Sequence, residues 1–181
     1  MSDLQRTRQT WEQIVKEGVK FGSVYYEPLL REKSAGEFEG KAYGSQAKMA
    51  RQLKIDVRKY RPLQGESHDD VLNRALTFIK TTTSKHLPHQ GKKQLLLITH
   101  GGFISEFYNA TCVLQSKPLQ TSDTALNCSV HVIQFTLNAK QRLCPKTLLK
   151  NDTSHLKLEI PSWQCPTPIS ALTEEEEESK E

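Results

Sequence analysis

A histidine followed by two glycines stands at the end of a short apolar run. Residues 95–99 read Leu-Leu-Leu-Ile-Thr, and His100, Gly101 and Gly102 follow directly. Glycine lets the backbone approach a ligand closely, and the free N–H groups at the start of a following helix favour an anion. A histidine at the end of a strand is about as often structural as functional. With the glycines behind it, His100 is a candidate for stabilising a bound phosphate or carboxylate.

The segments around this motif predict alternating helices and strands. Helical periodicity and caps, with Ser2 or Asp3 capping the first helix and a Ser67–Asp70 capping box on the third, predict helices at residues 2–17, 41–55, 67–87 and 103–114. Apolar or alternating runs predict strands at residues 23–28, 94–99, 129–137 and 147–150. This alternation favours an α/β fold with helices on both faces of a sheet. Ligands in such folds bind at the carboxyl ends of strands, which is where His100 lies.

The composition narrows the class of protein. With 181 residues, 36% hydrophobic and 25% charged, the chain suits one globular domain. No apolar run approaches the roughly 18 residues of a membrane span, and residues 1–20 do not read as a signal peptide, so we expect a cytoplasmic protein without a membrane partner. Widely spaced cysteines predict reduced thiols, and no cluster has metal-ligand spacing; the four are Cys112, Cys128, Cys144 and Cys165.

The charge is unevenly distributed along the chain. The formal net charge is +4, yet residues 174–181 hold six Glu and one Lys, a net charge of −5, so the preceding residues carry +9. Dispersed Lys and Arg without a recognisable motif argue against a nucleic-acid partner. A positive body suits a small anionic substrate, although many of these charges are expected simply to be solvated. We expect one domain at residues 1–157 and a disordered tail rich in Pro and Glu at residues 158–181.

Six segments resemble, in order, motifs of the histidine phosphatase (phosphoglycerate mutase-like) superfamily. They are SDLQRTRQT, LLREKSAGEFEG, GESHDDVLNRA, LLLITHGG, NCSVHVIQF and LLKNDTSHL, and together they extend over about residues 2–156. The resemblance implies an α/β fold with a mostly parallel sheet in three layers. The spacing and the REKSAGEFEGK and GES segments look nearest to the TIGAR-like fructose-2,6-bisphosphatase branch.

The resemblance assigns roles to individual residues. Arg6 matches the arginine that binds the substrate phosphate, Glu32 the proton donor, and His100 the second histidine of the site, with Gly101 beside the phosphate. These residue types suit phosphoryl transfer, because a planar guanidinium holds two phosphate oxygens and a carboxylic acid can protonate the leaving alkoxide. Each side chain also has a purely structural explanation. Arg6 could be an exposed arginine near a helix start, Glu32 a carboxylate in a loop, and His100 a histidine whose hydrogen bonds are satisfied within the protein. The family chemistry implies no metal and no cofactor, and the other histidines are expected to be structural or exposed.

One motif of the family does not occur in this sequence. The family begins with a strand ending in Arg-His-Gly, whose histidine is the nucleophile, and no Arg-His-Gly is present in the sequence. The resemblance therefore implies a chain shortened at its N-terminus that lacks the first, central strand of the sheet, beside residues 94–99. That strand would then lose a ladder partner and expose apolar surface, and the chain by itself is expected to be poorly stable and inactive.

Three functions stay open at this stage. The first is hydrolysis of a small phosphorylated sugar by a fructose-2,6-bisphosphatase-like enzyme of which this chain lacks the nucleophile. The second is a non-catalytic truncated isoform that serves as an anion-binding or interaction module, and the third is a phosphoglycerate mutase-type isomerase. If the pocket forms, the side chains of Arg6 and His100 should lie within roughly 8 Å, with Glu32 at the rim. The sequence does not predict the oligomeric state.

Overall fold

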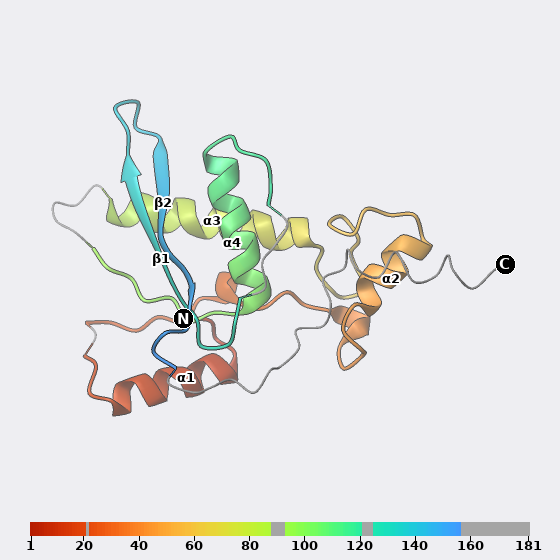
Figure 1. The fold of residues 1–181 in the computed structure, drawn as a ribbon, viewed down its shortest axis with the longest axis horizontal. Coiled ribbons are helices and arrows are strands. Elements are labelled where there is room, and N and C mark those ends of the chain that lie inside the picture. Colours follow the sequence, from red (N-terminus) through yellow and green to blue (C-terminus); the bar gives the residue numbers. More distant parts are fainter. Residues whose placement is uncertain (21, 88–92, 121–124, 157–181) are drawn as a thin grey trace.

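Helices dominate the computed structural model, which describes residues 1–20, 22–87, 93–120 and 125–156 (Figure 1). In chain order the elements are α1 (Gln5–Lys16), the 3-10 helices η1 (Pro28–Leu30) and η2 (Gly36–Phe38), α2 (Ser45–Gln52), α3 (His68–His86), α4 (Gly101–Leu114), β1 (Val130–Leu137) and β2 (Leu143–Asp152). The four predicted α-helices are confirmed, with ends displaced by a few residues. The predicted tail at residues 158–181 lies outside the described residues, as does Cys165, while Cys112, Cys128 and Cys144 are free thiols.

Helix α3 begins at the predicted capping box. Ser67 Oγ accepts a hydrogen bond from the backbone N–H of Asp70 at 3.1 Å, and the Asp70 carboxylate accepts one from the Ser67 N–H at 2.8 Å. Two N–H groups that the first turn leaves without partners are thereby satisfied. Lys85 and His86 occupy the last turn, where the helix dipole favours cations.

The core lies between α3 and α4. Its buried members are Leu30, Val71, Leu72, Ala75, Phe78, Ile79, Phe103, Phe107 and Ala110. Phe107 contacts the rings of Phe78, Phe103 and Phe135, at centroid distances of 6.4, 5.8 and 6.3 Å, so it joins α3, α4 and β1. This packing holds α4 in place and so positions its N-terminus.

The hairpin of β1 and β2 packs against this core. The strands are antiparallel, with Ile133 opposite Thr147 and Phe135 opposite Pro145, and the register shifts between Val130 and Val132. Ile133 and Phe135 contact the core cluster, and Figure 1 shows the hairpin beside α4 with α3 crossing behind. The strand predicted at 129–137 is confirmed, and the short strand predicted at 147–150 is the second half of the longer β2.

The mostly parallel sheet expected from the sequence is not formed by the described residues, whose one sheet is the two-stranded hairpin. Residues 23–28 and 94–99 belong to no ladder. Only Met1 and Ser2 link them: the terminal ammonium donates to Tyr25 O at 2.6 Å, Glu27 N to Met1 O at 2.8 Å, and Ser2 N to Ile98 O at 2.9 Å. Two linking residues are too few for regular pairing of six-residue segments, so both segments stay unpaired.

Candidate active site

Three segments far apart in the sequence bring the predicted site residues together. Arg6 lies in the first turn of α1, Glu32 follows η1, and His100 is the N-cap of α4. Leu30, which is 1% exposed, anchors η1 in the core, and Thr99 Oγ1 donates to Leu30 O at 2.7 Å. The loop that carries Glu32 is therefore fixed beside the segment that carries His100.

Arg6 and His100 are in direct contact. Arg6 Nε donates to His100 Nδ1 at 2.9 Å, which confirms the expected proximity, and His100 Nε2 lies 3.0 Å from Ser2 Oγ. Since Nδ1 accepts a hydrogen bond, the proton of the neutral ring is on Nε2, which donates to Ser2. The Ser2–His100 distance suits a nucleophile and its base, but this tautomer leaves Nε2 no lone pair with which to take the serine proton.

The environment keeps His100 neutral. The side chain is buried, and burial together with the Arg6 guanidinium lowers the pKa of His100 below its usual value, with Glu32 acting in the opposite direction. Desolvation and a neighbouring cation both penalise the imidazolium. At neutral pH the ring is therefore a hydrogen-bond donor through Nε2 and not a second fixed cation.

Glu32 lies at the start of α4, where an external anion was predicted. Its carboxylate accepts hydrogen bonds from Gly102 N at 3.2 Å and from Lys33 N at 2.8 Å. A Cβ on Gly102 would come within 2.4 Å of Glu32 Oε1, so glycine is required there for the close approach. At Gly101 an added Cβ would meet nothing nearer than Ala125 O at 3.8 Å.

Two residues of the site were missed by the sequence reasoning. Ser2 was predicted as a helix cap, but α1 has its N-cap at Leu4 without a side-chain cap, and Ser2 is buried against His100. The alternative cap, Asp3, instead pairs with Arg31. The contact of Ser2 with His100 joins residues 98 positions apart, so no local sequence signal predicted it.

Arg74 of α3 is the second missed residue. Its guanidinium donates to Leu29 O at 2.6 Å and to Glu32 O at 3.1 Å, and pairs with Glu66 at 2.9 Å. Glu66 also accepts from Ser34 N at 3.0 Å, on the other side of Glu32. The GES segment thus positions the loop of the proton-donor candidate from both sides, a role that only tertiary contacts reveal.

The site has a distinct chemical character. A guanidinium, a neutral imidazole and a carboxylate meet at a helix N-terminus, an arrangement suited to holding an oxyanion and supplying a proton. Within the described ranges no three His, Cys, Asp or Glu side chains are grouped to hold a metal ion. Nor does any helix of the described part combine the length and apolar character needed to cross a membrane.

Comparison with solved structures gives the same fold in known phosphatases. Mycobacterial glucosyl-3-phosphoglycerate phosphatase with inorganic phosphate aligns with a TM-score of 0.61 and 20% identity, over 83% of this chain and 74% of that one. The native structure of that enzyme gives the same values, and its complex with VO3 gives a TM-score of 0.58 and 19% identity over the same shares of both chains. At such identity the likeness shows the fold alone. No curated protein sequence matches the chain.

The family itself is shown by the sequence profile. Residues 1–144, most of the chain, match the histidine phosphatase superfamily, branch 1. They include α1, the Glu32 loop and the His100 segment. This chain belongs to the histidine phosphatase superfamily.

Proposed function

We propose that this chain carries the phosphate-holding and proton-donating half of a histidine phosphatase site for a small phosphorylated substrate. The observation that supports this most directly is the contact of Arg6 Nε with His100 Nδ1 at 2.9 Å, with Glu32 held at the adjacent helix N-terminus. Membership of the superfamily and the shared fold of phosphatases support the same reaction class.

Each side chain has a distinct task in the proposal. The exposed guanidinium of Arg6 uses Nε for His100, which leaves its terminal N–H groups for two phosphate oxygens. His100 Nε2, turned from Ser2, donates to a third oxygen. Glu32, as the proton donor, protonates the leaving alkoxide.

The nucleophile must come from elsewhere, because no Arg-His-Gly occurs in the sequence and the His100 tautomer does not activate Ser2. We propose that residues 23–28 and 94–99 are strands of a mostly parallel, three-layer sheet, which becomes complete when a strand carrying that motif lies beside residues 94–99. A phosphohistidine would form on that strand, and the groups described here would stabilise the transferring phosphoryl group.

The substrate class is assigned on sequence alone. The REKSAGEFEGK and GES segments favour a fructose-2,6-bisphosphatase-like substrate of the TIGAR-like branch, and we propose a cytoplasmic location for the protein. The similar solved structures are named for a different phosphorylated sugar derivative, so a broader set of sugar phosphates belongs in the assay.

The second candidate is a non-catalytic oxyanion-binding module. The observation in its favour is that Glu32 already occupies the N-terminus of α4 while the sequence contains no Arg-His-Gly nucleophile. In that case anions would bind to Arg6 and His100 without turnover in any form of the protein.

Binding of inorganic phosphate tests the site in the chain itself. Calorimetry should detect weak binding that falls about tenfold in Arg6→Ala, the loss expected for one charge-assisted pair of hydrogen bonds. Arg8→Ala is the matched control, since Arg8 is on the same helix but its guanidinium stacks 4.6 Å from the centre of the Tyr26 ring. Equal loss in both variants would contradict the proposed site.

Measurements of turnover distinguish the proposed phosphatase from the non-catalytic oxyanion-binding module. The chain alone should not hydrolyse fructose 2,6-bisphosphate or p-nitrophenyl phosphate, whereas a form extended by an Arg-His-Gly strand should hydrolyse both. In that form Glu32→Gln should lower kcat about 10²–10⁴-fold for the sugar phosphate and much less for the nitrophenyl ester, whose leaving group needs no proton. An extended form that binds phosphate but never turns over would favour the module.

A further inference from the structure

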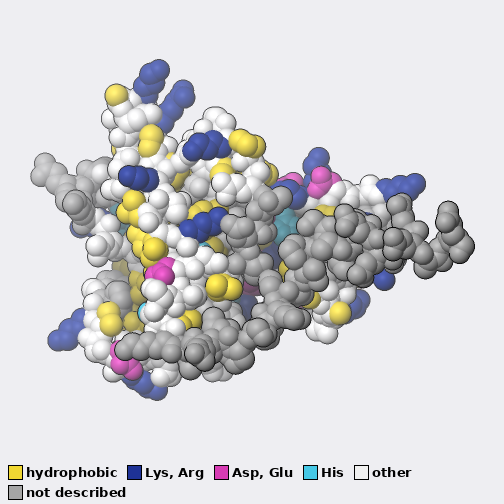
Figure 2. Space-filling model, in the orientation of Figure 1, with side chains coloured by type: hydrophobic (Ala, Val, Ile, Leu, Met, Phe, Trp, Pro, Cys, Tyr) yellow, Lys and Arg dark blue, Asp and Glu magenta, His cyan; other side chains and the backbone are white. Residues whose placement is uncertain are grey.

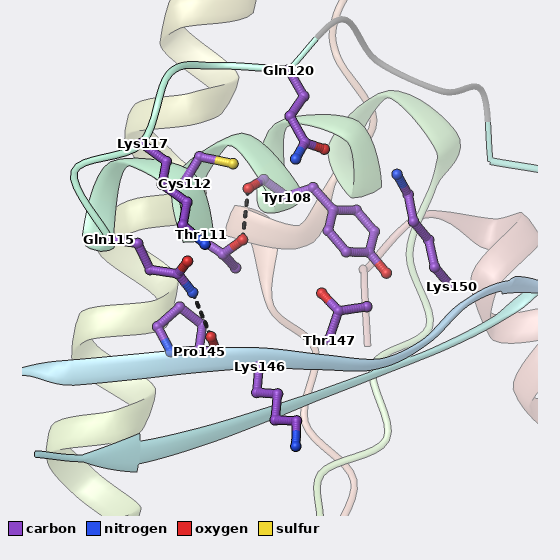
Figure 3. Close-up of a pocket in the computed structure, with 10 residues that line it drawn as sticks. All are labelled: Tyr108, Thr111, Cys112, Gln115, Lys117, Gln120, Pro145, Lys146, Thr147 and Lys150. Carbon is purple, nitrogen blue, oxygen red and sulfur yellow. Dashed lines mark hydrogen bonds between the residues drawn. The ribbon is translucent and has the colours of Figure 1, made fainter.

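A second concave site lies between α4 and β2, remote from Arg6 and His100 (Figure 3). Its volume is about 370 Å³, and its walls come from the C-terminal half of α4, the loop that follows and the middle of β2. Thr111 lines it eleven residues after His100, which places it about 16 Å further along the helix axis. The two sites therefore have no side chain in common.

Cations and hydroxyl groups characterise this pocket. Lys117 extends into it from the loop after α4 and Lys150 from β2, on opposite sides of Tyr108, while Thr147 points from β2 toward the same ring (Figure 3). Lys146 also borders the pocket but extends from the other side of β2. The described lining residues include no Asp or Glu.

The walls are held in place before any ligand binds. The Gln115 side chain donates to Pro145 O and so ties the end of α4 to β2. Tyr108 Oη lies 3.0 Å from His131 Nδ1, and Lys150 Nζ lies 5.1 Å from the centre of the Tyr108 ring. Walls held in this way lose little freedom on binding, which favours affinity.

We propose that this pocket binds oxyanions, the phosphate or carboxylate groups of a small polyanion. Ammonium groups from two sides neutralise the charge, the Thr147 hydroxyl donates a hydrogen bond, and the volume suits a small molecule. The surrounding surface reinforces the attraction, since Lys and Arg side chains gather over the hairpin and the adjoining end of α4 (Figure 2).

The same chemistry has two sources. One is a free phosphorylated or carboxylated metabolite, and the other is the run of glutamates at residues 174–178 of this chain. The eighteen residues after Leu156, up to Glu174, can reach about 60 Å when fully extended, ample for an intramolecular contact. Both sources present oxyanions to the same lysines.

Titration with inorganic pyrophosphate, followed by calorimetry and by amide resonances of the lining residues, tests the site. The Kd should rise at least about tenfold in the double variant Lys117→Gln with Lys150→Gln. Lys140→Gln is the matched control for each single change, Lys117→Gln and Lys150→Gln, because this exposed lysine in the hairpin turn removes one charge outside the pocket. An Arg6→Ala background, in which pocket binding should persist, separates this site from the phosphate site of α1 and α4.

Two results would overturn the proposal: a Kd unchanged by the double variant, or an increase in the Lys140→Gln control equal to that in each single variant, which would indicate diffuse attraction only. A variant with Gln at residues 174–178 separates the sources. If the glutamates occupy the pocket, this change should shift the Tyr108 and Thr147 resonances without pyrophosphate and tighten pyrophosphate binding. If a free anion is the ligand, neither should change. Absence of saturable binding in both chains would also overturn the site.

Discussion

Gly102 shows how a single residue couples helix geometry to chemistry. Its N–H donates to Glu32 at 3.2 Å, and the absence of a side chain lets the carboxylate come this close. Inside a helix, glycine is about 1 kcal/mol less favourable than alanine, so its presence here costs stability. The cost is consistent with a requirement at the site, since the nearest obstacle to a methyl group is the functional carboxylate itself.

Gly102→Ala should therefore separate stability from function. Thermal unfolding should show unchanged or higher stability, because the flexible Glu32 side chain can move aside, while the extended form should lose sugar-phosphate turnover at least about tenfold as the proton donor leaves its position. An added Cβ at Gly101 would meet nothing nearer than Ala125 O at 3.8 Å, so Gly101→Ala should leave the position of Glu32 unchanged. Full activity in Gly102→Ala would show that the Glu32 position does not matter.

At the scale of elements, a buried carboxylate joins α4 to the start of α3 and to the loop before it. Glu106, 1% exposed, accepts two hydrogen bonds from Arg58, at 3.1 and 2.7 Å, and lies 3.0 Å from His68 Nδ1. Asn109 donates to the same carboxylate at 3.1 Å. Burial opposes ionisation, but these hydrogen bonds outweigh it and lower the pKa of Glu106 to about 2. His68, predicted as structural or exposed, is one of the three side chains that contact the Glu106 carboxylate.

Acid should weaken this connection in a defined range. Because the folded pKa of Glu106 lies below its unfolded value near 4.5, its contribution is fully present above about pH 5 and is lost as the pH falls toward 2. Urea unfolding from pH 6 to pH 2.5 should show a steeper loss of stability in the wild type than in Glu106→Gln. At neutral pH the variant should be less stable by about 2–4 kcal/mol, since the half-buried Arg58 loses its buried partner charge and keeps only the more exposed Asp69, 3.3 Å away. Parallel pH profiles would exclude Glu106 as the source.

Local sequence signals predicted the helices and the hairpin, whereas the formation of a larger sheet depends on pairing between distant segments. The helices, the Ser67–Asp70 box and the hairpin follow from periodicity and caps within one segment, so the sequence predicts them well. The predicted sheet around residues 94–99 is not formed by the described residues, because a strand needs a hydrogen-bonded partner. In the site, the pattern at the strand end predicted His100, and the family resemblance added Arg6 and Glu32. The role of Arg74 could not be predicted, because the carbonyl groups to which it donates lie 42 and 45 residues away in the sequence.

At the scale of the whole molecule, residues 94–99 form an open edge. Leu97 packs on the α3–α4 core, yet Leu95 and Leu96 are 54% and 48% exposed, and no backbone hydrogen bond joins residues 94–97 to another described residue. Phe135 of β1 packs on the same core, and among the described residues β1 pairs with β2 alone, so no described strand covers its other edge. Open apolar edges of this kind invite pairing with a further strand.

Hydrogen exchange should reveal whether a strand completes this edge. In the chain alone, the amides of Leu95, Leu96 and Leu97 should exchange at nearly the rate of an unfolded peptide, whereas the amides of α3 and α4 should be protected by their helical hydrogen bonds. In a form extended by an Arg-His-Gly strand, these three amides should gain protection together, and the midpoint of thermal unfolding should rise as Leu95 and Leu96 become buried. Leu148 of β2, 53% exposed, is an internal control whose exposure should not change. Protection of residues 95–97 already in the chain alone would mean that another partner covers the edge, and the proposed role of the strand would then fail.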